Sequence, residues 1–228
     1  MDKKYYIDVL TTHADEHRRP QEFALIDFMD FCLDLFSADA FLNDENAFAK
    51  RVAAKMDEDL PFARLAFKWL CDVADAMERG EWLDAFGELY EELYLSRGKA
   101  SHKGQFFTPR SVSDLVSGII DNGKEDGEVN DCAAGSGRLL LSFFMERTKN
   151  DRNAGRRFRY LAQDSDPVAC KMCALNLMVH GMNATVVCQD TLAMSAPSVV
   201  YHVNEVRYPI QTPYYSVRVE LGKTDEKK

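Results

Sequence analysis

Three aspartates follow short apolar segments whose composition is typical of β-strands. Asp131 precedes a glycine turn over residues 133–137, Asp164 follows the next apolar segment, and Asp190 follows the one after it. In a parallel sheet the carboxyl ends of the strands meet at one edge, where turns expose backbone N–H groups and glycines admit a ligand. Three acidic strand ends in register are much rarer by chance than one. The spacing therefore predicts a ligand-binding edge.

The three carboxylates suit different parts of a nucleoside. A carboxylate at the tip of the second strand can accept hydrogen bonds from both hydroxyls of a ribose. Asp166 directly precedes Pro167 and is expected to be the N-cap of the next helix, which leaves Asp164 free for a ligand. Asp190 could accept from an adenine amino group. Taken alone, the glycine turn fits tight strand-to-helix packing equally well.

The elements that must position these residues alternate along the chain. The apolar pattern predicts strands at residues 128–131, 156–163 and 185–188, and helices at 109–120, 138–147 and 167–181. Such an alternation predicts an α/β fold with a doubly wound, mostly parallel sheet. Residues 208–219 are rich in Tyr, Val and Ile and could form a closing strand or hairpin.

The N-terminal part has a different pattern. Helical spacing predicts helices at residues 20–37, 39–56, 60–79 and 81–97, with no cluster of catalytic side chains. A glycine-bearing basic segment at 98–104 is typical of a loop. We therefore expect a small all-helical N-terminal domain at 1–97, serving packing or partner binding, and an α/β domain at 98–228.

Composition limits the classes of function. The chain has 228 residues, of which 46% are hydrophobic and 29% charged, which excludes a mostly disordered protein. Its formal net charge of -9 repels polyanions, so nucleic acid must be met by a local basic patch. Six basic residues between 147 and 159 could form such a patch or a solvated loop.

Cysteines and apolar runs indicate the compartment. No apolar stretch approaches the roughly 18 residues that span a bilayer, and the start has no signal-peptide pattern, so we expect a cytoplasmic protein without membrane contact. The six cysteines are expected to be reduced thiols. Cys170 and Cys173 form a lone CxxC without a second ligand pair, so we expect small apolar helix residues and no metal site.

Several segments resemble one known family. Residues 104–109, GQFFTP, resemble the GQ(F/Y)(F/Y)TP signature of N-6 adenine-specific DNA methyltransferases, particularly the modification subunits of type I restriction-modification systems. Further segments resemble family motifs in the family's order: 86–91 (LGxxYE), 131–137 (DPACGSG), 163–167 ((Q/V)E(I/V)DP), 176–181 (NLxLHG) and 189–192 (GDTL). The resemblance covers roughly residues 82–193. It implies a Rossmann-like methyltransferase fold that uses S-adenosylmethionine (SAM).

The same resemblance implies a role for each matching residue. Thr108 and the backbone near Phe107 would hold the methionine carboxylate, and Asp131 would approach the ammonium group. Asp164 would bind the ribose and Asp190 the adenine. The complete set of implied cofactor-binding residues is Phe107, Thr108, Asp131, Ala133, Gly135, Gly137, Asp164, Ser165, Asp190 and Thr191. Phe106 and Phe107 could also serve as apolar anchors of their loop.

The sequence departs from the family at the catalytic motif. Family members carry (D/N/S)PP(Y/F), which binds the amino group of a flipped-out adenine and stacks on its ring. The nearest match here is QTPY at 211–214, in which Gln211 could accept from the amino group and Tyr214 could stack. Arg138 and Cys132 also replace a small residue and a proline of the family pattern, which suggests weaker cofactor binding.

Two functions fit these observations. The first is a SAM-dependent DNA adenine methyltransferase, or the cofactor-binding portion of one, which acts on DNA with a separate specificity subunit and in a homo- or hetero-oligomer. The second is an inactive methyltransferase relic that serves as a SAM-binding, DNA-binding or assembly module, favoured by the missing motif. A nicotinamide-dependent oxidoreductase fits poorly, because the glycine turn lacks GxGxxG.

Overall fold

The computed structural model describes residues 1–38, 47–95, 107–120, 123–151, 153–205 and 215–222. The N-terminal helices are α1 (Lys3–Glu16), α2 (Gln21–Leu35), α3 (Ala47–Glu58), α4 (Leu60–Glu78) and α5 (Ala85–Tyr90), the last continued by a π-helical turn over Glu91–Leu95. Then follow α6 (Arg110–Ile120), β1 (Gly127–Asp131), α7 (Arg138–Thr148), a 3₁₀ turn (Ala154–Arg157), β2 (Phe158–Asp164), α8 (Pro167–Val179), β3 (Ala184–Cys188), β4 (Val199–Val203) and β5 (Val217–Leu221). Within the described residues, no helix combines the length and apolarity required to traverse a bilayer.

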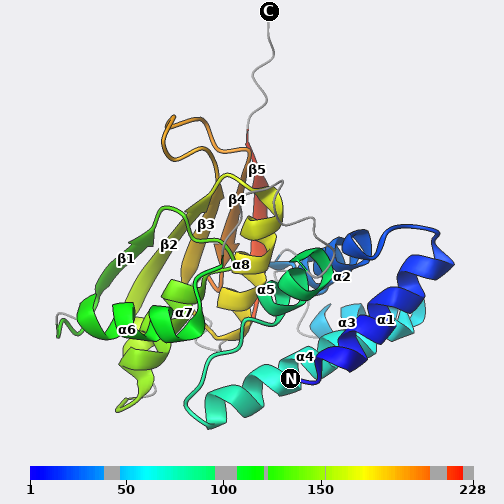
Figure 1. Ribbon diagram of the computed structural model, residues 1–228, viewed down its shortest axis with the longest axis horizontal. Coiled ribbons are helices and arrows are strands. Elements are labelled where there is room, and N and C mark those ends of the chain that lie inside the picture. Colours follow the sequence, from blue (N-terminus) through cyan, green and yellow to red (C-terminus); the bar gives the residue numbers. More distant parts are fainter. Residues whose placement is uncertain (39–46, 96–106, 121–122, 152, 206–214, 223–228) are drawn as a thin grey trace, which may run out of the picture.

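The strands form one five-stranded sheet in the order β1-β2-β3-β4-β5. β1, β2 and β3 are parallel, whereas β4 and β5 each run antiparallel to the preceding strand. Because strand order follows chain order, right-handed crossovers place α7 and α8 on the same face of the sheet, as Figure 1 shows. The buried side chains of β2 alternate accordingly: Phe158 and Tyr160 are buried, and Arg159 between them is exposed.

This topology corrects one expectation. A doubly wound sheet needs a reversal of strand order, which sends the crossover helices to the opposite face. Among the described strands there is no reversal, so that part of the chain is not doubly wound. The α/β alternation through β3 is confirmed, while the antiparallel β4 was not predicted.

The predicted helices and strands of the site region end within a few residues of their expected bounds. Helix α1 was not predicted; its buried residues are Tyr6, Leu10 and Ala14. These three are spaced four residues apart and pack as one stripe. The helix expected at 39–56 is described only from Ala47 onward.

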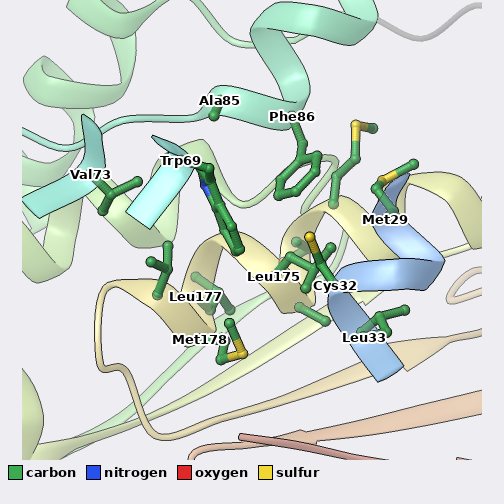
Figure 2. Packing of buried hydrophobic residues seen from close by; sticks show 14 of the residues in the cluster. Met29, Cys32, Leu33, Trp69, Val73, Ala85, Phe86, Leu175, Leu177 and Met178 are labelled. Carbon is green, nitrogen blue, oxygen red and sulfur yellow. The ribbon is translucent and has the colours of Figure 1, made fainter. Parts of the chain in front are cut away.

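The buried residues of the helical and α/β parts form one hydrophobic cluster. Figure 2 shows the side chains of α2, α4 and α5 meeting those of α8 in this cluster. Trp69 of α4 packs edge-on against Phe86 of α5, with ring centroids 5.0 Å apart, and Leu175 of α8 is fully buried beside them. The division into domains at 97/98 stays a prediction, but the two parts share their core.

The shared core predicts cooperative unfolding. Leu175→Ala should remove about 2–5 kcal/mol from the free energy of unfolding, because it leaves a cavity in the common cluster. Both tryptophans, Trp69 and Trp82, lie in the helical part. Urea titration followed by tryptophan fluorescence should therefore report the full loss, although the substitution lies in α8. Leu221→Ala, at a side chain 76% exposed, is the matched control. An unchanged fluorescence midpoint in Leu175→Ala would show that the parts unfold independently.

Candidate functional site

The turns that follow β1, β2 and β3 are tied together by hydrogen bonds. The N–H of Gly135 donates to Oδ2 of Asp164 at 2.9 Å, which joins the glycine turn to the end of β2. The N–H of Gln189 donates to the carbonyl of Asp164 at 2.8 Å, and Oγ1 of Thr191 donates to the carbonyl of Cys132 at 3.1 Å. The three strand ends therefore converge at one sheet edge, as the spacing predicted.

The two carboxylate oxygens of Asp131 differ in their hydrogen bonding. Its Oδ1 accepts from the N–H of Ala133 at 3.1 Å. Its Oδ2 is buried and has no hydrogen-bond partner among the described residues. Burial raises the pKa of this carboxyl, the hydrogen bond from Ala133 lowers it, and the charge of Asp164 raises it, with a net rise. A buried acceptor without a donor is costly, so this position suits a cationic ligand group.

Asp164 is not left free, which corrects the sequence-based expectation. Oδ2 accepts from Gly135, and Oδ1 accepts from the N–H of Asp166 at 2.9 Å. Each carboxylate oxygen still has a second lone pair, so a ribose contact would add to these bonds. Asp166 does cap α8, because its Oδ1 accepts from the N–H groups of Val168 at 2.6 Å and Ala169 at 3.3 Å.

The glycine turn needs glycine at two positions. Gly135 has φ +56° and Gly137 has φ +92°, both in the left-handed region. A Cβ on Gly137 would lie 3.1 Å from Sγ of Cys173, so this position also requires close contact with α8. The turn thus brings α7 against α8 and leaves its backbone next to the acidic strand ends.

Asp190 shapes its own turn. Its Oδ1 accepts from the N–H groups of Leu192 at 3.0 Å and Ala193 at 2.9 Å, while its N–H donates to Oγ of Ser195 at 3.0 Å. Asp190 itself is exposed. The structure therefore places this exposed carboxylate at the shared edge, and its Oδ2 accepts no hydrogen bond from the described residues.

Phe107 and Thr108 lie against the glycine turn. The ring of Phe107 packs edge-on against Tyr90 at 5.7 Å between centroids, and a Cβ on Gly135 would lie 3.6 Å from that ring. The guanidinium of Arg138 lies 5.1 Å from the Phe107 ring centre and donates through Nη1 to the carbonyl of Thr108 at 3.4 Å. Phe107 thus anchors its loop; Phe106 lies outside the described residues.

A buried carboxylate that the sequence analysis did not single out organises this region. Asp84, only 1% exposed, caps α5 by accepting from the N–H of Gly87 at 2.8 Å. Its Oδ2 also accepts from Oγ of Ser136 and Nε of Arg138, both at 2.5 Å, and its Oδ1 accepts from Nδ2 of Asn176 at 2.6 Å. One carboxylate therefore joins α5, the glycine turn, α7 and α8.

Arg138 completes this network. Its Nη2 donates to Oε2 of Glu91 at 2.8 Å while Nε donates to Asp84. Burial lowers the pKa of Arg138, but the hydrogen bonds and charges of Glu91 and Asp84 raise it more. In the structure Arg138 pairs with two acids, and the weaker cofactor binding expected from this residue stays a prediction. The sequence offers one signal for this pairing. Two acids stand close together there: Asp84 lies just before residues 86–91, and Glu91 ends that segment.

The remaining candidates are placed as follows. Gln211 and Tyr214 lie outside the described residues. The carbonyl of Ser165 accepts from Sγ of Cys188 at 3.9 Å, so its backbone faces β3. Cys170 and Cys173 are buried, and burial raises the pKa of both thiols.

Two arginines of the basic cluster between residues 147 and 159 make contacts within the protein. Arg157 pairs with Asp151 at 2.6 Å. The guanidinium of Arg147 lies 5.1 Å from the ring centre of Phe158. These contacts support the interpretation of a structured, solvated loop more than that of a free phosphate-binding patch.

Comparison with known proteins identifies relatives of this chain. The family model described as N-6 DNA Methylase matches residues 82–227. A type I restriction enzyme MpnII methylase subunit from Mycoplasma pneumoniae is 31% identical over 149 residues, which cover 60% of this chain and 27% of that protein. The type I restriction enzyme MjaIX methylase subunit from Methanocaldococcus jannaschii is 31% identical over 112 residues, which cover 47% of this chain and 19% of that protein. The chain thus spans about a quarter or less of these relatives.

Solved structures give a weaker likeness. A modification subunit of a putative type I restriction enzyme from Vibrio vulnificus has 23% identity and a TM-score of 0.36, over 47% of this chain and 23% of its own. A methyltransferase subunit of a type I restriction-modification system from Streptococcus thermophilus has 20% identity and a TM-score of 0.35, over 83% of this chain and 52% of its own.

The glycine turn predicts a sharp difference between two glycines. Gly137→Ala should lower the free energy of unfolding by about 1–3 kcal/mol, because alanine is strained at positive φ and its Cβ would press on Cys173. Gly118→Ala in α6, where a Cβ meets open space, should be neutral or stabilising by up to about 1 kcal/mol. Chemical denaturation of both variants tests this, and equal effects would refute the role assigned to Gly137.

The Asp84 network predicts a large cost for losing one charge. Asp84→Asn should lower the free energy of unfolding by about 3–5 kcal/mol, because it leaves the buried guanidinium of Arg138 with one acid fewer. Asp75→Asn, at an exposed position of α4, is the matched control. Thermal unfolding monitored by circular dichroism measures both. A cost for Asp84→Asn no larger than that of the control would show that the network is not structural.

Proposed function

This chain belongs to the N-6 DNA methylase family, and we propose that it binds SAM at the carboxyl ends of β1–β3 and serves methyl transfer to adenine in DNA. The observation that carries the proposal is the buried Oδ2 of Asp131, which has no donor among the described residues and lies beside the glycine turn. Such an oxygen accepts a stronger hydrogen bond from a charged donor, such as an ammonium group, than from a neutral donor.

Different residues around Asp131 would bind different parts of the cofactor. Thr108 and the backbone beside Phe107 would hold its carboxylate, and the turn at Gly135 and Gly137 would pass beneath it. Asp164 and Ser165 would bind the ribose, and Asp190 and Thr191 the adenine. This assignment is supported by the hydrogen bonds that bring these turns together and by the spare acceptor positions on both aspartates.

The chemistry requires little from the protein beyond position. SAM supplies an electrophilic methyl group on a sulfonium, which an in-line displacement transfers. The chain would contribute by orienting the acceptor and by accepting the developing positive charge on nitrogen. We propose Gln211 as the acceptor of the adenine amino group and Tyr214 as the ring that stacks on the base, by analogy with the family motif.

DNA recognition is proposed to depend on partner proteins. The curated relatives are named as methylase subunits of type I restriction enzymes. A net charge of -9 makes this chain alone a poor ligand for a polyanion. We therefore propose that it acts with a specificity subunit. The alternative, a SAM-binding module without transfer activity, is favoured by the replacement of (D/N/S)PP(Y/F) with QTPY at 211–214.

Cofactor binding and methyl transfer should be measured separately. Calorimetric titration with SAM should show binding that Asp131→Asn weakens about 10- to 100-fold, the value of one charge-assisted hydrogen bond. Asp164→Ala should weaken it as well, while Asp126→Asn, exposed just before β1, should not. No SAM binding by the unchanged chain would refute the site. Transfer of tritiated methyl to unmethylated DNA that Tyr214→Ala abolishes would support the enzyme; binding without transfer would support the alternative.

Because the pKa of Asp131 is raised, the affinity for SAM and the free energy of unfolding should change with pH in opposite directions. SAM affinity should fall as the pH is lowered into the acidic range, because the carboxyl takes up a proton at a higher pH than an ordinary aspartate and then cannot pair with the ammonium. The same proton uptake favours the folded protein without ligand, since its pKa is higher there than in the unfolded chain, so this group's contribution to stability rises as pH falls. Asp131→Asn should lack both effects. Parallel slopes in the variant and the unchanged chain, measured by calorimetry and denaturation, would contradict the assignment.

A further inference from the structure

A buried histidine lies where the end of α8 meets the helical part of the chain. His180 is the C-cap residue of α8, and it is 0% exposed. Its Nδ1 lies 2.7 Å from the carbonyl oxygen of Asn176, one turn earlier in α8. Its Nε2 lies 3.3 Å from the backbone nitrogen of Leu83, in the segment between α4 and α5. The ring therefore joins two elements that are 97 residues apart in the chain.

The two partners determine the protonation state of the ring. A carbonyl oxygen can only accept, so Nδ1 must carry a proton and donate to Asn176. A backbone N–H can only donate, so Nε2 must accept from Leu83 through its lone pair. Only the neutral ring with its proton on Nδ1 meets both conditions. A second proton, on Nε2, would point at the N–H of Leu83 and would abolish that hydrogen bond.

The surroundings do not compensate a charge on this ring. Two charged groups lie nearby: Asp84, on the segment before α5, and Arg156 of the 3₁₀ turn, whose Nη2 would lie 3.1 Å from a Cβ on Gly181. The carboxylate of Asp84 is already paired with Arg138. Burial lowers the pKa of the histidine from 6.5 to about 4, the backbone bond within α8 opposes the shift, and among the described residues no neighbouring charge adds to it.

The same contact lies next to the Asp84 network. Leu83 donates to the histidine, and the following residue, Asp84, caps α5 by accepting from the N–H of Gly87 at 2.8 Å. The side chain of Asn176 donates to Asp84 at 2.6 Å, while its carbonyl oxygen accepts from His180. Loss of the bond to Leu83 would therefore weaken the attachment of this segment to α8.

We propose that the buried ring of His180 makes the contact between α8 and the segment carrying Asp84 sensitive to acid: a proton taken up by the ring breaks the bond to Leu83 and opens the contact. The proposal is independent of cofactor binding. Because the folded protein keeps this ring neutral, the opened or unfolded chain binds more protons. The stabilisation from this group is therefore complete above about pH 6.5 and is lost as the pH falls toward about 4.

The test compares the full 228-residue chain with H180Q, whose side chain does not titrate. Between about pH 6.5 and about pH 4, the equilibrium constant for unfolding of the unchanged chain should rise up to about tenfold more per pH unit than that of the variant, and about 300-fold more over the whole range. Urea titrations at a series of pH values, followed by tryptophan fluorescence, measure both constants. H17Q, at an exposed histidine just after α1, is the matched control and should behave like the unchanged chain.

Two measurements on the unchanged chain keep the proposal testable if H180Q does not fold. Nitrogen-15 NMR of the folded protein should show that one of the five histidine rings is still neutral at about pH 5, with its proton on Nδ1. Exchange of the Leu83 amide, corrected for its intrinsic rate, should become faster as the pH falls below about 6. Equal pH slopes in the unchanged chain and H180Q would overturn the proposal. So would five charged rings in the folded protein at about pH 5, or a slope lost in H17Q and kept in H180Q.

Discussion

The buried carboxylate of Asp84 is the interaction on which the arrangement of this molecule depends. A charge that is 1% exposed is tolerated only when its oxygens are fully used. Asp84 achieves this with donors from four places: its own helix, the glycine turn, α7 and α8. Since each donor must stand at hydrogen-bonding distance from the same two oxygens, the helical part cannot shift without moving the turn at the strand ends.

That constraint connects the helical region to the turns at the strand ends. Arg138 transmits the position of Asp84 and Glu91 to the loop at Phe107 and Thr108, by stacking on the ring and donating to the carbonyl. The shared hydrophobic cluster adds a non-directional attachment between the same parts. The directional contacts fix the geometry, and burial of apolar surface supplies most of the free energy.

The sequence predicted the local features and missed the long-range ones. Strand ends at Asp131, Asp164 and Asp190 follow from apolar periodicity and turn residues, and the N-cap at Asp166 follows from the proline after it. The pairing of Asp84 with Arg138 joins residues 54 apart, which no local pattern encodes. Strand order posed the same difficulty. Periodicity shows that a segment is a strand, but the strands beside it depend on the packing of the whole chain, so the antiparallel β4 could not be foreseen.

The negative charges at neighbouring strand ends repel one another, and the fold offsets this repulsion only in part. Asp131 and Asp164 lie on adjacent parallel strands, and the charge of Asp164 contributes to the raised pKa of Asp131. Backbone N–H groups of the glycine turn and of Asp166 occupy the Asp164 oxygens and so compensate its charge. Asp131 receives one such bond, and its other oxygen remains buried without a donor among the described residues. Within the described residues, the fold thus compensates the carboxylate of Asp164 with two hydrogen bonds and that of Asp131 with one. This asymmetry, more than the number of acids, is the reason for the proposal that Asp131 contacts a cationic ligand group.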